Sequence, residues 1–323
     1  MDTPRIETML DHWELAPLRE WTTVKDRVVF EIATADGARF MLKDRGELDG
    51  WWWDRLPFEH DVTSHLDRCG VPVAVLLETR DGEPAAVVDG RVCSLSPALR
   101  NRPTELTRDE SPAFYRNCGR AIARMHRALA SYPTDGLEEK TWRTDLHDRI
   151  IATCIPYLRE HLPEPARSRL SRLVEGAEGN MARAYRDLPD QLVFWDCHPG
   201  NTVRDGAEIT GFVDCNHFAI APRMFDVAHY ILHLVKWDTD APGKTAVWLD
   251  DFPQLLCDYD EVAPLTAHEK MAFPCLLLVG PLLFMDGSLR NGDQASPVEL
   301  RTFEWLCLQR EEIARRIAAS GVL

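Results

Sequence analysis

Hydrophobic and polar residues alternate over short stretches in the first part of the chain, in the way that is typical of β-strands. Residues 27–33 and 38–43 are two such stretches, and the Asp-Gly pair at 36–37 predicts a hairpin between them. Residues 73–77 and 85–88 flank a second turn-like segment and predict a second hairpin. This part of the chain is therefore expected to be rich in β-structure.

One helix is expected among these strands. Phe58, Val62 and Leu66 recur at helical spacing, and the pattern stops at Gly70. Near residue 95 the hydrophobic pattern changes from short β-type stretches to a helical period. We therefore expect a hinge at 92–97 between two lobes.

Beyond that boundary the apolar residues follow a helical period. The first helix is expected to begin at the Ser-Pro pair 111–112, where Ser is a favourable N-cap and Pro fits the first turn. Further helices are expected at roughly 143–160, 165–187, 224–237, 266–285 and 297–319.

Length and charge narrow the class of protein. The 323 residues exceed what a single compact core usually contains, so two lobes are expected. The 52 acidic and 37 basic residues give a formal net charge of −15, which disfavours binding to nucleic acid or to an anionic membrane. We expect neither as a partner, whereas a cationic small ligand is compatible with this charge.

The cysteines and the apolar stretches indicate a cellular compartment. The 9 cysteines are dispersed, with no Cys-x-x-Cys pair, which predicts a reducing environment. The longest apolar stretch, 271–285, is interrupted by Pro274, Gly280 and Pro281, and the first residues do not resemble a signal peptide. We expect a cytoplasmic protein without a membrane span. No feature of the sequence indicates an oligomeric state.

A compact stretch with β-character, residues 191–218, lies between the helical segments and contains Asp196, Asn201 and Asp214. Phosphoryl transfer from a nucleotide requires a carboxylate that orients the attacking hydroxyl and accepts its proton. It also requires an amide oxygen and a second carboxylate that hold Mg²⁺. Asp196 as base or orienter, with Asn201 and Asp214 as Mg²⁺ ligands, would supply all three groups. A surface loop with ordinary turn-forming Asp and Asn is the alternative.

The amino-acid sequence of this stretch resembles a motif of a known superfamily. Residues 196–201, Asp-Cys-His-Pro-Gly-Asn, resemble the D-x-H-P-G-N loop of the aminoglycoside phosphotransferase, choline kinase and homoserine kinase-like superfamily. Val213-Asp214 resembles its metal-binding Asp. Residues 226–228, Asp-Val-Ala, resemble its D-x-A element, in which the Asp opens a helix and braces the catalytic loop.

The resemblance extends over roughly residues 20–285, including 119–126, which are similar to the helix that precedes the catalytic region. It implies an α+β, two-lobed protein kinase-like fold. A small β-rich nucleotide-binding lobe would occupy residues 1–95, and a larger, mainly helical catalytic and acceptor-binding lobe would occupy residues 96–323.

The resemblance also implies an activity, that of a small-molecule kinase that uses ATP and Mg²⁺. The γ-phosphoryl group would pass to a hydroxyl of the acceptor. Lys43 is similar to the lysine of the phosphate-binding strand, and Glu59 is similar to its partner in the helix that follows. We expect an ion pair between Lys43 and Glu59 that directs the lysine toward the phosphates.

Two positions depart from the superfamily pattern. His-Gly usually precedes the catalytic Asp, whereas this chain has Phe194-Trp195, so loop packing and acceptor access are expected to differ. The nucleotide-covering loop is expected around residues 20–26, which contain no glycine. These departures favour an alternative, a non-catalytic nucleotide-binding pseudokinase. The joint presence of the Asp, Asn and Asp of the catalytic stretch argues against it.

Three classes of acceptor remain open. An aminoglycoside-like antibiotic fits the negative charge, homoserine or a similar amino alcohol fits a weaker resemblance at 259–269, and a peptide in a biosynthetic pathway is the third. The helix that begins at Asp226 is expected to border the acceptor. Asp238 or Asp240 is the expected partner of an acceptor amine.

Overall fold

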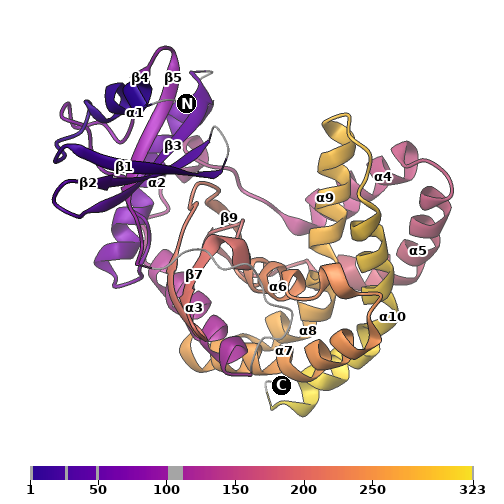
Figure 1. Ribbon diagram of the computed structural model, residues 1–323. Helices are drawn as coiled ribbons and strands as arrows, with labels where there is room; N and C mark the ends of the chain where they lie inside the picture. Colours follow the sequence, from indigo (N-terminus) through magenta and orange to yellow (C-terminus); the bar gives the residue numbers. More distant parts are fainter. Residues whose placement is uncertain (1–2, 26–27, 49–50, 101–111, 322–323) are drawn as a thin grey trace.

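The computed structural model describes residues 3–25, 28–48, 51–100 and 112–321. Figure 1 shows a β-sheet with its helices at one end and a larger group of helices at the other. The expected α+β architecture, with a small β-rich lobe and a larger, mainly helical lobe, is confirmed. The exact boundary at residue 95 stays a prediction.

The N-terminal lobe is a five-stranded sheet in the order β1-β2-β3-β5-β4, and its neighbouring strands are antiparallel. The strands are β1 (Leu18–Lys25), β2 (Val29–Thr34), β3 (Arg39–Glu47), β4 (Ala86–Val88) and β5 (Arg91–Pro97). Helix α1 (Thr3–Leu10), which was not predicted, packs its buried Ile6 and Met9 into the same apolar cluster as Phe30 and Leu42 of the sheet.

The first hairpin and the helix of this lobe are confirmed. Strands β2 and β3 pair across the turn at Gly37, whose φ of 88° suits glycine. Helix α2 (Trp51–Arg68) contains the expected helical stretch, and its Val62 and Leu66 are buried against the helical lobe.

The second hairpin was predicted wrongly. Residues 73–77 form no strand and contribute only one isolated bridge, from Val73 to Phe212. Strand β4 pairs instead with β5, through a turn in which Asp89 and Gly90 have φ of 51° and 75°. Residues 92–97, expected as the hinge, therefore lie in a strand that is paired on both sides, with β3 and β4.

The nucleotide-covering loop also differs from expectation. Residues 20–25 belong to β1, and Lys25 pairs with Val29 of β2. The connection between these strands is therefore short, and its residues 26–27 lie outside the described part of the chain.

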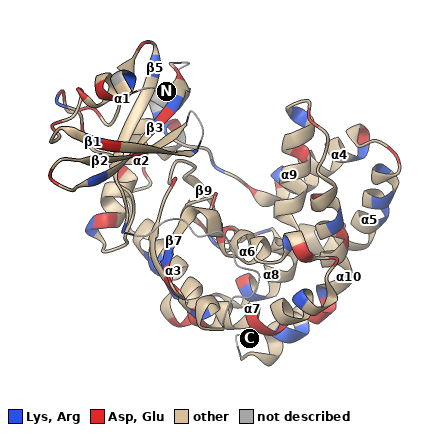
Figure 2. Cartoon of the chain, in the orientation of Figure 1, with Lys and Arg blue, Asp and Glu red and all other residues tan. Residues whose placement is uncertain are grey.

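The helical lobe contains most of the predicted helices, with ends shifted by a few residues. Its helices are α3 (Pro112–Ala130), the π-helix η2 (His147–Cys154), α4 (Ile155–His161), α5 (Ala166–Ala184), α6 (Met224–His233), α7 (Pro242–Val262), α8 (Ala267–Leu276), α9 (Val279–Arg290) and α10 (Pro297–Ala319). Figure 2 shows Lys and Arg interspersed with Asp and Glu over these helices and over the sheet.

The prediction of one helix at 266–285 was wrong in detail, because α8 and α9 meet at a bend of 46°. Within the described residues, no individual helix has the length and apolar composition to cross a membrane, although this bent pair meets both criteria when its two halves are joined. Leu276 and Leu282 of the pair are buried in the main apolar core.

The compact β-stretch between the helices is confirmed as two small antiparallel pairs. Strand β6 (Asp190–Val193) pairs with β9 (Ala219–Pro222), and β7 (Thr202–Asp205) pairs with β8 (Glu208–Phe212). Figure 1 shows β7 and β9 between the N-terminal sheet and helix α6. The polar residues at the ends of these strands are therefore placed where the two lobes meet.

Candidate active site

Asp196 lies on the loop that joins β6 to a short 3₁₀ turn, η3 (Pro199–Asn201). The side-chain Nδ2 of Asn201 donates to Oδ2 of Asp196 at 3.0 Å and to its main-chain oxygen at 3.0 Å. His198 caps the turn, since its Nδ1 accepts a hydrogen bond from the backbone N–H of Gly200 at 3.1 Å. The spacing of five residues thus brings the Asp and the Asn into direct contact.

Asp226, in the first turn of α6, fixes the backbone that leads into this loop. It is fully buried, and its two oxygens accept the backbone N–H groups of Phe194 at 2.8 Å and Trp195 at 2.9 Å. His126 Nε2, from α3, lies 3.1 Å from Oδ2 of the same carboxylate, and its other ring nitrogen lies 2.8 Å from the Tyr259 hydroxyl. The expected bracing role of Asp226 is confirmed. These contacts hold Trp195 in the left-handed region, with φ of 67°.

The surroundings of Asp196 make its carboxylate more basic than that of an exposed aspartate. Burial raises the pKa of Asp196, and this outweighs the opposite effects of His198, His217 and the Asn201 hydrogen bond. His198 Nε2 is 3.7 Å and His229 Nε2 is 3.9 Å from its carboxylate oxygens. A carboxylate with a raised pKa is a stronger proton acceptor than an exposed aspartate, which is the property a general base needs.

Asp214 follows β8 and forms an ion pair with Lys43 of β3. The two side chains come from different lobes, so this contact spans the space between the sheet and the small β-hairpin that follows the Asp196 loop. Burial acts to raise the pKa of Asp214, but the charges of Lys43, Arg45 and His217 together hold it below its ordinary value. Asp214 is therefore a stable anion.

Glu59 has a different partner from the one expected. It binds Arg45 through two hydrogen bonds, at 2.7 Å and 3.0 Å, and Arg45 Nε also donates to the Ser94 hydroxyl at 2.9 Å. The predicted ion pair between Lys43 and Glu59 is replaced by Lys43–Asp214 and Glu59–Arg45. The side chains of Arg45 and Glu59 are both buried, with exposures of 4% and 8%. The guanidinium of Arg45 binds both oxygens of the Glu59 carboxylate, whereas Lys43 would contact it through a single nitrogen. The signal in the sequence is that Arg45 lies two positions after Lys43 and so shares its face of the strand.

Asn201 and Asp214 supply the oxygen ligands that a divalent cation such as Mg²⁺ requires. Because Asn201 Nδ2 is engaged with Asp196, its amide oxygen is turned away from that carboxylate, and no hydrogen bond to this oxygen is formed within the described part of the chain. The donor set therefore fits Mg²⁺, with Asn201 and Asp214 as the residues that would hold it.

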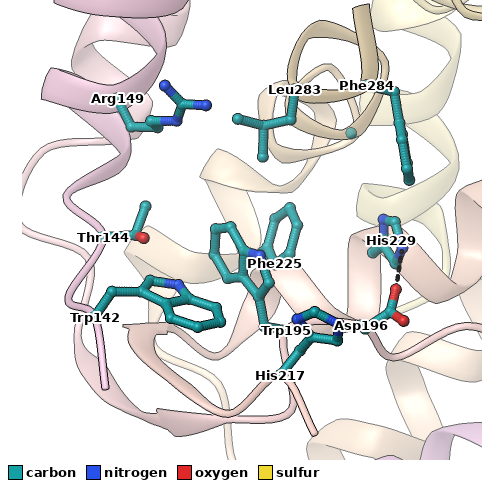
Figure 3. A pocket seen from close by; sticks show the side chains of 11 residues that line it. Trp142, Thr144, Arg149, Trp195, Asp196, His217, Phe225, His229, Leu283 and Phe284 are labelled. Carbon is teal, nitrogen blue, oxygen red and sulfur yellow. Dashed lines mark ion pairs between the residues drawn. The ribbon is translucent and has the colours of Figure 1, made fainter. Parts of the chain in front are cut away.

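A cavity of about 430 Å³ opens on the other side of Asp196 (Figure 3). Lys43, Asn201 and Asp214 are not among its lining residues. It is lined by Trp142, Thr144, Arg149, Trp195, Asp196, His217, Phe225, His229, Gly280, Leu283 and Phe284. Asp196 thus lies between the residues suited to a nucleotide and metal and a separate, largely aromatic cavity.

His229 of α6 presents unsatisfied nitrogens to this cavity. The residue is 4% exposed, and neither ring nitrogen has a hydrogen-bond partner within the described chain. Burial lowers the pKa of His229, so the ring is neutral. Gly280 leaves space beside it, because a Cβ there would lie 3.6 Å from His229 Nδ1. A bound molecule could complete the hydrogen bonding of this ring.

The acidic residues expected at the acceptor lie elsewhere. Asp238 is 3.8 Å from Lys244, Asp240 is 3.1 Å from Arg301, and neither lines the cavity. An acceptor amine in this cavity would therefore not contact either of them, because both follow the end of α6 and the cavity borders its first turns. Lys236, which follows α6, forms a buried ion pair with Glu299, with 3.2 Å between Nζ and Oε1.

Comparison with known proteins fits this geometry. Residues 25–265 match the sequence model of a group described as the phosphotransferase enzyme family, APH. The chain belongs to this family. Two homoserine kinases are similar to it: that of Neisseria meningitidis is 26% identical over 235 residues, 72% of this chain and 70% of that protein, and that of Pseudomonas aeruginosa is 24% identical over 298 residues, 88% and 85% of the two chains.

Solved structures of kinases are similar to this phosphotransferase in fold. An amicoumacin kinase, in complex with AMP-PNP and Ca²⁺, has a TM-score of 0.68 at 15% identity and covers 96% of this chain and 93% of its own. A microcompartment-associated aminopropanol kinase has a TM-score of 0.68 at 14% identity and covers 100% and 99%. The kinase-like fold expected from the sequence is therefore confirmed, and the protein is a small-molecule kinase.

Sequence reasoning missed most of the residues around the cavity of this kinase. Trp142 and Arg149 precede the catalytic loop by many positions, and Phe284 follows it by many more. Trp195 was expected to affect acceptor access, and His229 lies on the helix beginning at Asp226, which was expected to border the acceptor. Since these residues come from η2, α6, α9 and the segment before η2, their meeting is decided by helix packing and leaves no local pattern.

Proposed function

We propose that this phosphotransferase transfers the γ-phosphoryl group of ATP, in a Mg²⁺-dependent reaction, to a hydroxyl of a small molecule bound in the aromatic cavity. The observation that carries the proposal is the position of Asp196. Its carboxylate is bonded to Asn201 on one side and lines the cavity on the other. A hydroxyl in the cavity would thus face both its proton acceptor and the nucleotide side of the cleft.

Asp196 is proposed as the general base. As the hydroxyl oxygen attacks the γ-phosphorus, its proton passes to a carboxylate oxygen of Asp196, whose pKa burial has raised. The bond between the γ-phosphorus and the β,γ-bridging oxygen breaks, and ADP leaves. Asn201 keeps the carboxylate in one orientation through its Nδ2 hydrogen bond. Asp226 in turn fixes the backbone before Asp196, so the base is held by two independent contacts.

On the nucleotide side, Asn201 and Asp214 are proposed to hold Mg²⁺, which when bound would neutralise charge on the phosphates. Lys43 is proposed to contact the phosphates once it exchanges Asp214 for them. Glu59 is proposed to contribute through Arg45, whose guanidinium it orients, and not through Lys43. Lys43 and Arg45 both lower the pKa of Asp214, so both cations lie near the position proposed for the metal and the phosphates.

The nucleotide side is tested with Asp214→Ala. The amide of Asn201 alone is a weak ligand for a hard divalent cation, so the variant should lose the Mg²⁺-dependent part of nucleotide binding. The measurement is the rise in Tm with increasing AMP-PNP, in the presence of Mg²⁺ and of EDTA. Wild type should show a larger rise with Mg²⁺, and the variant should show the same small rise in both.

The matched control is Asp205→Ala, which removes an exposed aspartate from the same small hairpin. It should respond to Mg²⁺ and nucleotide as wild type does. A variant at Asp214 that retains the full Mg²⁺-dependent rise would contradict the assignment of the metal site.

A further inference from the structure

The charged groups that line the cavity are few and lie far apart within it. Among the described lining residues, the ionised side chains are Asp196 and Arg149. Figure 3 shows Arg149 across the cavity from Asp196, with its guanidinium directed into the open space. If Asp196 is the base, no further carboxylate of the described lining is available to bind a cationic acceptor.

Arg149 is held by a buried acid. Its Nη2 donates to Oδ2 of Asp286 at 2.8 Å, and Asp286 of α9 is fully buried. Arg290 donates to both oxygens of Asp286 at 2.9 Å. The group of two arginines and one aspartate therefore carries a formal charge of +1. Asp286 fixes the guanidinium of Arg149 through Nη2 alone, which leaves other N–H groups of Arg149 for a further partner.

Arg149 also has free capacity on the cavity side. Its side chain is 36% exposed, and within the described chain its Nε and Nη1 make no hydrogen bond. The residue lies on the π-helix η2, a rare form that is frequent at functional sites. A planar guanidinium with open N–H groups matches a carboxylate in shape and charge.

Aromatic side chains form much of the wall between Arg149 and Asp196. Trp195 stacks on Phe225, with ring centroids 4.2 Å apart and an angle of 27° between the rings, and Trp142 and Phe284 form further walls. The volume of about 430 Å³ lies in the range of cavities that enclose drug-sized molecules. This is more room than a small amino alcohol fills.

We propose that the acceptor is a hydroxy acid with a planar or apolar body, whose single carboxylate binds Arg149 while its hydroxyl reaches Asp196. The aromatic walls hold the body, and His229 offers a neutral hydrogen-bonding group near the base. One excess positive charge matches one carboxylate and not a polycation. This inference rests on the proposed function, because it takes the cavity beside Asp196 as the acceptor site.

The test uses small aromatic alcohols that differ in the charge of one substituent, and an unrelated polycation. These are 4-(hydroxymethyl)benzoate, its primary amide and the corresponding benzylamine, with kanamycin as a polycation. Binding to the protein in the presence of AMP-PNP and Mg²⁺ is measured by calorimetry, which needs no turnover. The benzoate should bind about tenfold or more tightly than the amide, because a charge-assisted pair is lost in the amide.

The site is assigned with Arg149→Gln, which should remove the preference for the carboxylate, and with Arg149→Lys, which should restore part of it. Arg290→Gln is the matched control, since Arg290 binds the same Asp286 but does not line the cavity. The control should keep the preference, and Tm values of all variants report on folding.

The proposal is wrong if the benzoate binds no better than its amide, including the case in which neither binds, or if the amine or kanamycin binds best. It is also wrong if Arg149→Gln and Arg290→Gln change the preference equally. Failure of phosphoryl transfer would leave these binding results unchanged, so it would count against the proposed function alone.

Discussion

Trp195 is the residue at which this phosphotransferase departs most clearly from the pattern of its family. Its backbone has φ of 67°, a conformation that costs a residue with a side chain about 1–3 kcal/mol. Asp226 sustains it by accepting the N–H groups of both Phe194 and Trp195. The resemblance implied a glycine here, and the structure gives the reason: the loop needs a left-handed residue. Trp195 adopts this conformation although it carries a large side chain, and its indole forms a wall of the cavity.

This dual role leads to a prediction for Trp195→Gly. The change relieves the backbone strain but removes the stack on Phe225, so turnover should change little while the acceptor KM rises about tenfold. The measurement is steady-state kinetics with an acceptor found in an ADP-release screen. Trp195→Phe, which keeps an aromatic ring and the strain, is the control and should keep a KM near that of wild type. A KM unaffected by Gly would remove Trp195 from the acceptor site.

Individual residues also show what sequence reasoning reached and where it stopped. Asp196, Asn201 and Asp214 were predicted because one local unit carries them all, and the contacts of Asp196 with Asn201 follow from their spacing. The partner of Glu59 was predicted wrongly, because Lys43 and Arg45 point from the same face of β3 and only packing decides which of them reaches the helix.

Helix α7 is the largest element that the sequence did not reveal. Pro242 is tolerated in its first turn, but Pro253 lies inside it, and an interior proline argues against a helix when only the sequence is read. Burial of aromatic side chains compensates for this proline, because Trp248, Phe252 and Tyr259 of α7 are almost fully buried in the main core.

The second hairpin was predicted at the wrong place. Asp89-Gly90 was also available as a turn, and β4 pairs with β5 through it.

The packing of α7 on α3 requires a glycine. A Cβ at Gly119 of α3 would collide with the carbonyl oxygen of Leu255 in the backbone of α7. We predict that Gly119→Ala lowers the free energy of unfolding by about 1–3 kcal/mol, because the backbone of a packed helix cannot move aside freely. Urea denaturation measures this value.

Gly176→Ala provides the comparison. Gly176 is an exposed residue of α5 with open space around it, so alanine there should stabilise the helix by about 0.5–1 kcal/mol. If the two variants had the same stability, the close approach of α3 and α7 would not be a constraint on the fold.

The two lobes meet at the ion pair between Lys43 and Asp214, and the proposed reaction takes place where they meet. The two-lobed fold was predictable, because a β-rich stretch is followed by helical periodicity. The acceptor cavity was not, because its walls come from segments that only tertiary packing brings together. The negative charge of the chain suggested a cationic acceptor, whereas the described lining of the cavity places Arg149 across from Asp196. Net charge is thus a poor guide to the charge of a single site.

The proposed reaction depends on the claim that Asp196 accepts the proton of the attacking hydroxyl. It is tested most directly by the rate of phosphoryl transfer by Asp196→Asn, compared with wild type, together with the affinity of both for ATP and Mg²⁺. We expect the rate of the variant to be lower by about 10²-fold or more with nearly unchanged ATP affinity, since the proposed base is lost and the nucleotide side is kept. The wild-type rate should also fall as the pH drops through the pKa of Asp196, because only the deprotonated carboxylate can accept the proton. That pKa is raised, so the fall should begin at a higher pH than for an exposed aspartate. An Asp196→Asn enzyme as active as wild type would contradict the claim.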